Sequence, residues 1–150
     1  MNIVIRAYKE KDLNEMIHIW NEIVEEGIAF PQEELLTYET GKEFFASQTY
    51  SAVAVDADSD KIYGRYILHP NNVGRCGHIC YASYAVKKDL RGQGIGELLV
   101  KDCIKKAGEY GFKILQFTAV VKTNIPAMNL YKKLGFTPLG VIPGGFLSAN

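Results

Sequence analysis

Three glycines lie close together in the segment Arg91-Gly92-Gln93-Gly94-Ile95-Gly96, between an apolar run that ends at Val86 and an apolar-periodic run that begins at Ile95. A turn without Cβ atoms exposes its backbone N–H groups, and these groups can surround a bulky anion. The turn leads directly into a predicted helix, whose free N–H groups and dipole add to the attraction. The segment therefore predicts a site for a pyrophosphate group.

Two well-known phosphate-binding motifs do not match this segment. A P-loop has Lys and then Ser or Thr after its last glycine, whereas Glu97 and Leu98 follow Gly96 here. A dinucleotide-binding fingerprint has its third glycine one position later and an acidic residue about 20 positions further on. The next strand-like run, 114–121, contains no acidic residue. The pattern that remains is Arg-x-x-Gly-x-Gly.

At that spacing, the segment 86–96 resembles the coenzyme A loop of the GNAT N-acetyltransferase superfamily. A second block follows at the distance that the superfamily uses, with Asn124, Ala127, Tyr131 and Leu134-Gly135-Phe136 at matching offsets. The segments 19–27 and 141–146 are similar to the small-molecule branch related to phosphinothricin acetyltransferase. The resemblance covers nearly the whole chain.

The resemblance implies that acetyl-CoA is the cosubstrate. By position, the pantetheine would lie along the backbone of Ala85, Val86 and Lys88. Asn124 would contact the cofactor and cap the helix that follows. The pyrophosphate would be held by Arg91, Gly92, Gln93, Gly94, Ile95 and Gly96. A few charge-assisted N–H bonds of roughly 1.5 to 3 kcal/mol each are enough for micromolar binding.

Acetyl transfer to an amine passes through a tetrahedral oxyanion and releases a thiolate. The site therefore needs an oxyanion donor and a proton source near the sulfur. Tyr131 matches the position at which many superfamily members place a tyrosine that protonates the departing thiolate. A phenol can deliver that proton or stabilise the thiolate by a hydrogen bond. The resemblance thus implies direct attack of the amine on the thioester, with Tyr131 as general acid.

The identity of the general base stays open. A lysine-like amine is almost fully protonated at pH 7 and needs a base, whereas an α-amine needs little help. Some related small-molecule enzymes have a carboxylate in the strand before the glycine loop, where this chain has Tyr81. Glu26, Glu33, Glu34 and Tyr84 are the remaining candidates, acting directly or through water.

The acceptor itself is not identified by the sequence, and two further functions stay open. Acetylation of a protein or peptide amine would need an acidic groove for a basic segment. A non-catalytic CoA-binding domain would keep the loop and lack the base. A small-molecule primary amine is the expected acceptor.

A chain of 150 residues with 47% hydrophobic residues is expected to form a single domain with a sizeable core. Lys plus Arg and Asp plus Glu both number 17, so no overall charge favours nucleic acid or an anionic membrane as a partner. No apolar run is long enough to span a bilayer, and three cysteines without a secretory signal indicate reduced thiols. We expect a cytoplasmic protein.

Cys76, His78 and Cys80 alternate along a predicted strand and would share one face. A zinc site needs further ligands, and no second Cys or His pair occurs at ligand spacing. We therefore expect no metal.

The elements that position these residues follow from the hydrophobic pattern. A first helix is predicted from a cap at Asp12 to Gly27, with Leu13, Ile17, Trp20 and Val24 on one face. Strands are predicted at 2–7, 50–57, 61–68, 78–86, 113–121 (buried on both faces) and 136–142, and further helices at 35–47, 94–110 and 125–134. The second helix is expected to break near Thr40-Gly41.

This order predicts a mixed α+β fold. The resemblance implies a mostly antiparallel twisted sheet with flanking helices, which splays between the strand before the glycine loop and the strand after its helix. A closing strand is expected to be missing after 136–142. The exposed edge would mean either a shortened form of a longer protein or a homodimer in which a second subunit covers the edge.

Overall fold

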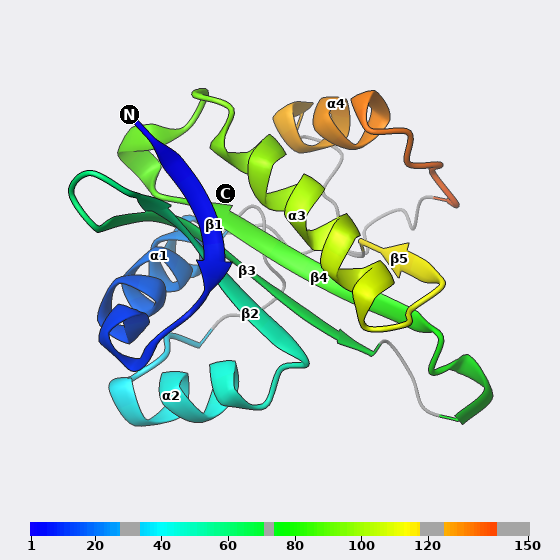
Figure 1. The fold of residues 1–150 in the computed structure, drawn as a ribbon, viewed down its shortest axis with the longest axis horizontal. Helices are drawn as coiled ribbons and strands as arrows, with labels where there is room; N and C mark the ends of the chain where they lie inside the picture. The colour runs from blue at the N-terminus through cyan, green and yellow to red at the C-terminus, as the bar shows by residue number, and fades with distance from the viewer. Residues whose placement is uncertain (28–33, 71–73, 118–124, 141–150) are drawn as a thin grey trace.

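The computed structural model describes residues 1–27, 34–70, 74–117 and 125–140. Five strands form one sheet in the order β1-β2-β3-β4-β5 (Figure 1). The strands are β1 (Ile3–Ala7), β2 (Tyr50–Asp56), β3 (Lys61–Pro70), β4 (Ile79–Val86) and β5 (Ile114–Gln116). Strands β1 to β4 pair in antiparallel fashion, and β5 pairs with β4 in parallel. The expected mixed, mostly antiparallel α+β fold is confirmed.

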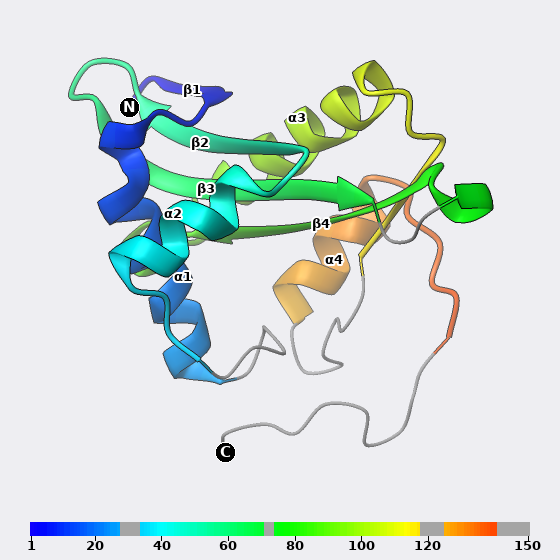
Figure 2. The same cartoon turned by 90° about the horizontal axis from the view of Figure 1, so that it is seen from below.

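Two layers of helices cover the sheet. The helices are α1 (Leu13–Glu26), α2 (Tyr38–Ala46), α3 (Ile95–Glu109) and α4 (Ile125–Lys133), with short 3-10 turns η1 (Glu10–Asp12), η2 (Gly74–Cys76) and η3 (Lys88–Leu90). Helices α1 and α2 lie on one side of the sheet and α3 on the other (Figure 2). No helix in the described ranges is long and apolar enough to cross a membrane.

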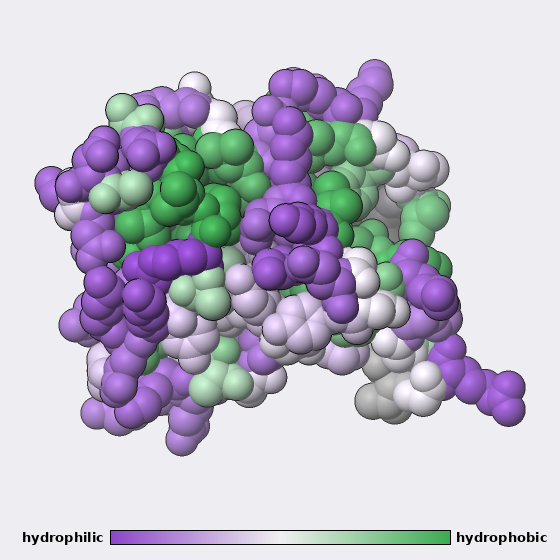
Figure 3. Space-filling model, in the orientation of Figure 1, coloured by the Kyte–Doolittle hydropathy of each residue, from purple (hydrophilic) through white to green (hydrophobic). Residues whose placement is uncertain are grey.

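The predicted inner faces of α1 and α3 are confirmed. Leu13, Ile17, Trp20 and Val24 are all buried between α1 and the sheet, and Leu99, Cys103 and Ala107 are buried beneath α3. On the outer surface of the side that carries α3, polar residues run between two apolar areas (Figure 3). The sheet is therefore packed on both faces, with one core under each helix layer.

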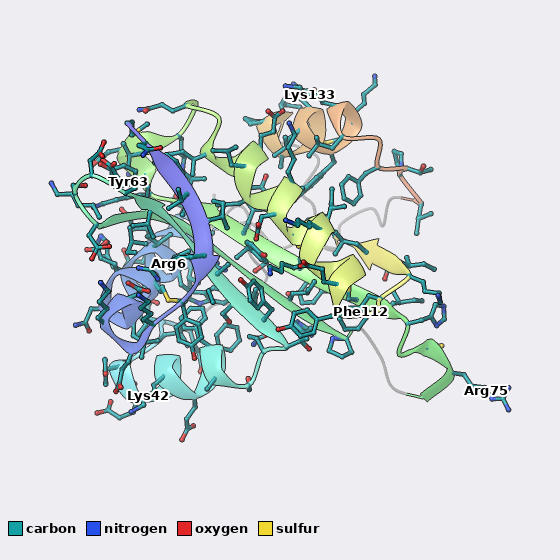
Figure 4. All side chains as sticks on the ribbon, in the orientation of Figure 1. Arg6, Lys42, Tyr63, Arg75, Phe112 and Lys133 are labelled. Atoms are coloured by element: carbon teal, nitrogen blue, oxygen red, sulfur yellow. The ribbon has the colours of Figure 1, made fainter. Side chains whose placement is uncertain are left out.

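Helix α1 begins after Asp12 and ends at Gly27, as predicted, but Asp12 does not cap it in the expected way. Its carboxylate accepts hydrogen bonds from Arg6 Nη1 at 2.7 Å and from the backbone N–H of Lys9 at 2.8 Å. Arg6 reaches the start of α1 from β1 (Figure 4). At the other end, Gly27 adopts the left-handed conformation (φ 66°) and donates its N–H to the carbonyl of Val24. Asp12 thus ties the helix start to β1.

The expected break at Thr40-Gly41 is wrong, since α2 is continuous from Tyr38 to Ala46. Gly41 faces α1, and a Cβ atom there would lie 2.5 Å from Ile17 Cδ1. The glycine is needed because the two helices approach closely, and it does not interrupt the helix.

The last two predicted strands lie only partly within the described residues. Of the expected strand at 113–121, β5 covers Ile114–Gln116, and residues 118–121 lie outside the described ranges. Ile114 is 46% exposed, so the strand is not buried on both faces. Residues 136–140 form no strand, and 141–142 lie outside the described ranges. Pro138 and Gly140 weaken strand pairing in this segment.

Strands β4 and β5 are paired over a short region of the described residues. Their register runs from Ile79 opposite Ile114 to Tyr81 opposite Gln116, and β4 then continues to Val86. Throughout this second half β4 stays paired with β3. Residues 118–121, which would continue β5, lie outside the described ranges, so the implied splay between these strands stays a prediction.

Candidate active site

The glycine turn connects η3 to α3 at the end of β4. Gly92 and Gly94 both have φ near 81°, a conformation that L side chains rarely adopt, and Gly94 is the N-cap of α3. A Cβ atom at either position would meet no atom of the described residues within 4 Å. The backbone conformation requires these glycines, and open space lies beside them at the N-terminus of a helix. Such a turn fits a pyrophosphate.

At Gly96, close packing and not backbone conformation requires glycine. It lies within α3, and a Cβ atom there would be 3.2 Å from Tyr84 Cε2 and 3.9 Å from Leu130 Cδ2. Its small size lets the first turn of α3 lie against β4 and α4. Ile95 is 1% exposed, so its side chain belongs to the core and only its backbone faces the turn.

The strand edge that leads into the turn contains Ala85 and Val86. Both residues pair with β3, opposite Arg65 and Gly64, while β5 has no described residue opposite them. Lys88 follows in η3 and is exposed, as is Gln93 in the turn. Ala85 and Val86 thus lie where β4 approaches the glycine turn. Asn124, the remaining expected cofactor contact, lies outside the described ranges.

Arg91 forms a two-point ion pair with Glu26 at the end of α1. Arg91 Nη1 lies 3.1 Å from Glu26 Oε2, and Arg91 Nη2 lies 2.5 Å from Glu26 Oε1. The hydrogen bonds from Arg91 lower the pKa of Glu26. A carboxylate with a lowered pKa is a weak base for an ammonium group, so this contact disfavours Glu26 as the general base.

Tyr131 lies on α4, beside Tyr84 of β4 and Phe117, which follows β5. Its ring stacks on Phe117 at 4.5 Å, and the ring of Tyr84 stands edge-on to it at 6.2 Å. The two phenols are close enough for each to influence the pKa of the other. Burial, followed by the neighbouring Tyr84, raises the pKa of Tyr131, and burial also raises the pKa of Tyr84. Both phenols therefore stay protonated at neutral pH.

No described contact joins Glu34 or Tyr81 to this pair. Glu34 is exposed, and Glu33 lies outside the described ranges. Tyr81, which stands where some related enzymes have a carboxylate, is half-buried, and the ring of His69 stands edge-on to it at 4.3 Å. Burial raises the pKa of Tyr81, so it too stays protonated.

A buried arginine was missed by the sequence analysis. Arg65 on β3 is fully buried, its Cζ atom lies 4.6 Å from the centre of the Trp20 ring, and its Nη1 donates to the carbonyl of Ser83 at 3.4 Å. Burial lowers its pKa to about 9. Its sign in the sequence is a single arginine within an apolar strand pattern. Hydrophobic periodicity alone does not predict where the side chain of such a residue lies.

The described residues contain no group of three or more His, Cys, Asp or Glu side chains that could hold a metal ion. Cys76 lies in the exposed turn η2 and not in a strand with Cys80, which is buried in β4. Its neighbour Arg75 points away from the body of the molecule (Figure 4).

Comparison with known proteins gives consistent matches. The model of the acetyltransferase (GNAT) family matches residues 13–136. The N-acetyltransferase aca1 of Schizosaccharomyces pombe is 29% identical over 149 residues, which cover 89% of this chain and 71% of that protein. The structure of a GCN5-related N-acetyltransferase from Kribbella flavida is 33% identical, with a TM-score of 0.89, and the match covers 98% of this chain and 89% of the other.

A phosphinothricin acetyltransferase from Sinorhizobium meliloti, solved in complex with acetyl-CoA, has the same fold. Its TM-score is 0.85 at 21% identity, and the match covers 93% of this chain and 77% of the other.

Proposed function

Since the chain belongs to the acetyltransferase (GNAT) family, we propose that it transfers an acetyl group from acetyl-CoA to the primary amine of a small molecule. The observation that carries this proposal is the glycine turn, in which Gly92 and Gly94 hold φ near 81° in front of α3 and leave the space beside them open. Ala85, Val86, Lys88 and Asn124 also belong to the proposed cofactor-binding residues. The set is completed by four further residues of the turn and the start of α3, which are Arg91, Gln93, Ile95 and Gly96.

Acetyl-CoA would supply the activated thioester. The backbone N–H groups of the turn would hold its phosphates, helped by the dipole of α3. The backbone of β4 at Ala85 and Val86 would align the pantetheine. The hydroxyl of Tyr131 would then donate a hydrogen bond to the departing sulfur, and the amine would attack the thioester directly.

A small-molecule acceptor is supported by the sequence similarity of segments 19–27 and 141–146 to the phosphinothricin acetyltransferase branch. The fold shared with the enzyme from Sinorhizobium meliloti agrees with this assignment. The balanced charge of 17 basic and 17 acidic residues supplies no overall attraction for a basic peptide.

The test is release of the CoA thiol, measured with a panel of small amines, amino acids and peptides with free N-termini. We expect acceptor-dependent release with at least one small amine. If only peptides are acetylated, the acceptor is a peptide amine in place of a small molecule, and the proposed acetyl transfer still holds. Binding of CoA without release in any arm of the panel would contradict a catalytic role.

A further inference from the structure

Glu26 and Arg91 connect two parts of the molecule that are far apart in the sequence. Glu26 is the last residue of α1, and Arg91 is the first residue of the glycine turn. The two side chains are 24% and 40% exposed and meet through both guanidinium Nη atoms. The end of α1 is thereby attached to the loop that would bind the pyrophosphate.

A two-point contact of this kind fixes the plane of the guanidinium group as well as its position. Arginine has five N–H donors, and the contact with Glu26 uses one on each Nη atom. The remaining N–H groups stay available to a second anion. Arg91 directly precedes Gly92, so holding its side chain also holds the start of the turn.

We propose that Glu26 is a positioning residue for the cofactor: its carboxylate holds Arg91 and the first residue of the glycine turn in the conformation that accepts the pyrophosphate. The inference rests on the proposed function, because it assumes that the pyrophosphate binds at this turn. It gives Glu26 a role on the cofactor side of the reaction, away from the base that deprotonates the amine.

The direction in which CoA affinity changes when the Glu26 charge is removed tests this role. A carboxylate beside a pyrophosphate repels it, and Glu22 adds a second negative charge near Arg91. If repulsion were the main effect, removal of the Glu26 charge would strengthen CoA binding. If positioning is the main effect, the same change weakens CoA binding. A partly exposed ion pair contributes little to the stability of a fold, so the loss should appear in binding and not in thermal unfolding.

The experiment is calorimetric titration of the full chain with CoA, together with thermal unfolding of each variant. Glu26→Gln removes the charge and keeps the shape. Glu25→Gln is the matched control, because Glu25 is an exposed neighbour with the same charge. Arg91→Gln and the double variant complete a double-mutant cycle.

We expect Glu26→Gln to weaken CoA binding about five- to tenfold, while Glu25→Gln changes it less than about twofold. The double variant should bind CoA no more weakly than Arg91→Gln alone, because Glu26 acts through Arg91. With acetyl-CoA and an acceptor, Glu26→Gln should raise KM for acetyl-CoA and leave kcat unchanged.

Unchanged or tighter CoA binding by Glu26→Gln overturns the inference and leaves the proposed function intact. Equal effects of the two glutamate variants, or additive effects of Glu26→Gln and Arg91→Gln, also overturn it. A parent chain that does not bind CoA contradicts the proposed function, and the inference falls with it.

Discussion

Tyr131 on α4 lies against Tyr84 on β4, with the two rings edge-on to each other. Because burial raises the pKa of both phenols, neither is expected to lose its proton near neutral pH. A thiol has an ordinary pKa of about 8.5, so full transfer of a proton from a buried phenol to the thiolate is uphill. The hydroxyl of Tyr131 is therefore better suited to donating a hydrogen bond to the sulfur as charge develops.

Replacement of Tyr131 by Phe tests this role. We predict that Tyr131→Phe keeps the affinity for CoA, since the ring still stacks on Phe117, and lowers kcat by about 10 to 10⁴. Tyr110→Phe, at an exposed tyrosine after α3, is the control and should leave kcat unchanged. Steady-state kinetics from about pH 6 to about pH 9 are the measurement. Full activity throughout that range would reduce Tyr131 to a packing residue.

Gly94 is required by its backbone conformation and faces open space. We predict that Gly94→Val destabilises the fold by about 1 to 2 kcal/mol, because φ is near 81° there, and abolishes CoA binding by filling the cradle. Gly108→Ala is the control: a Cβ there meets nothing within 4 Å, and the change should stabilise α3 by about 0.5 to 1 kcal/mol. Calorimetry that finds unchanged CoA affinity in Gly94→Val would contradict binding of the pyrophosphate at the glycine turn.

At the scale of the elements, the sequence predicts those features that depend on residues close together in the chain. The bounds of α1 followed from its apolar spacing and Gly27, and the conformation of the glycine turn followed from residues 91–96. Gly41 was misread because its reason, the side chain of Ile17, lies on another helix. The contact between Glu26 and Arg91 was missed for the same cause, since 65 positions separate the two residues.

A side chain at position 41 would obstruct the close approach of α1 and α2 and lower the stability of the fold. We predict that Gly41→Ala lowers the free energy of unfolding by about 1 to 3 kcal/mol, because the new Cβ overlaps Ile17. Ile17→Val removes the Cδ1 methyl, so the double variant should lose less than the sum of the single changes. Denaturant unfolding of the four proteins is the measurement. Strictly additive losses would show that the two residues do not compete for space.

The junction between β1 and α1 should be sensitive to acid. Burial alone would raise the pKa of Asp12, but the hydrogen bonds from Arg6 and from the Lys9 N–H lower it below its usual value. A lowered carboxyl pKa stabilises the fold above the unfolded value of about 3.9, and this stabilisation is lost as the pH falls below it. We predict that Asp12→Asn is less stable by about 1 to 3 kcal/mol at pH 7 and that the difference shrinks as the pH falls from about 5 to about 3.

Denaturant unfolding at several pH values measures this effect, with Asp89→Asn, an exposed position in η3, as the control. A difference between parent and Asp12→Asn that stays constant down to pH 3 would mean that Asp12 acts through packing alone.

At the scale of the whole molecule, the described sheet ends in two edge strands, β1 and β5. Val4 on β1 is 43% exposed and Ile114 on β5 is 46% exposed. Edge strands of this kind are templates for pairing with another chain. The β5 edge also borders an apolar hollow of about 300 Å³, lined in part by Ile104, Phe112 and Phe136.

We predict that the chain forms a homodimer through the β5 edge. Ile114→Lys should then yield monomers, because a charge on an edge strand opposes pairing, while Val4→Lys on the opposite edge should leave the dimer intact. Light scattering at several protein concentrations is the measurement. A parent protein that is monomeric at every concentration would refute the dimer.

Each face of the sheet contains a buried side chain with an optical signal. Trp20, the single tryptophan, is buried on the side of α1 and α2 against Phe44 and Phe45. Tyr66 is buried on the side of α3 and donates a hydrogen bond to Asp102 at 2.6 Å.

Burial, with the bond to Asp102, raises the pKa of Tyr66, so its phenolate absorbance in alkali should appear only when the α3 side opens. Trp20 fluorescence reports on the opposite side. If the two cores unfold as one cooperative unit, both signals should change together during alkaline unfolding. The late phenolate absorbance, to which Tyr84 on the same side also contributes, should then develop at the rate of global unfolding. The protein thus has a built-in pair of spectroscopic probes, one for each half of its interior.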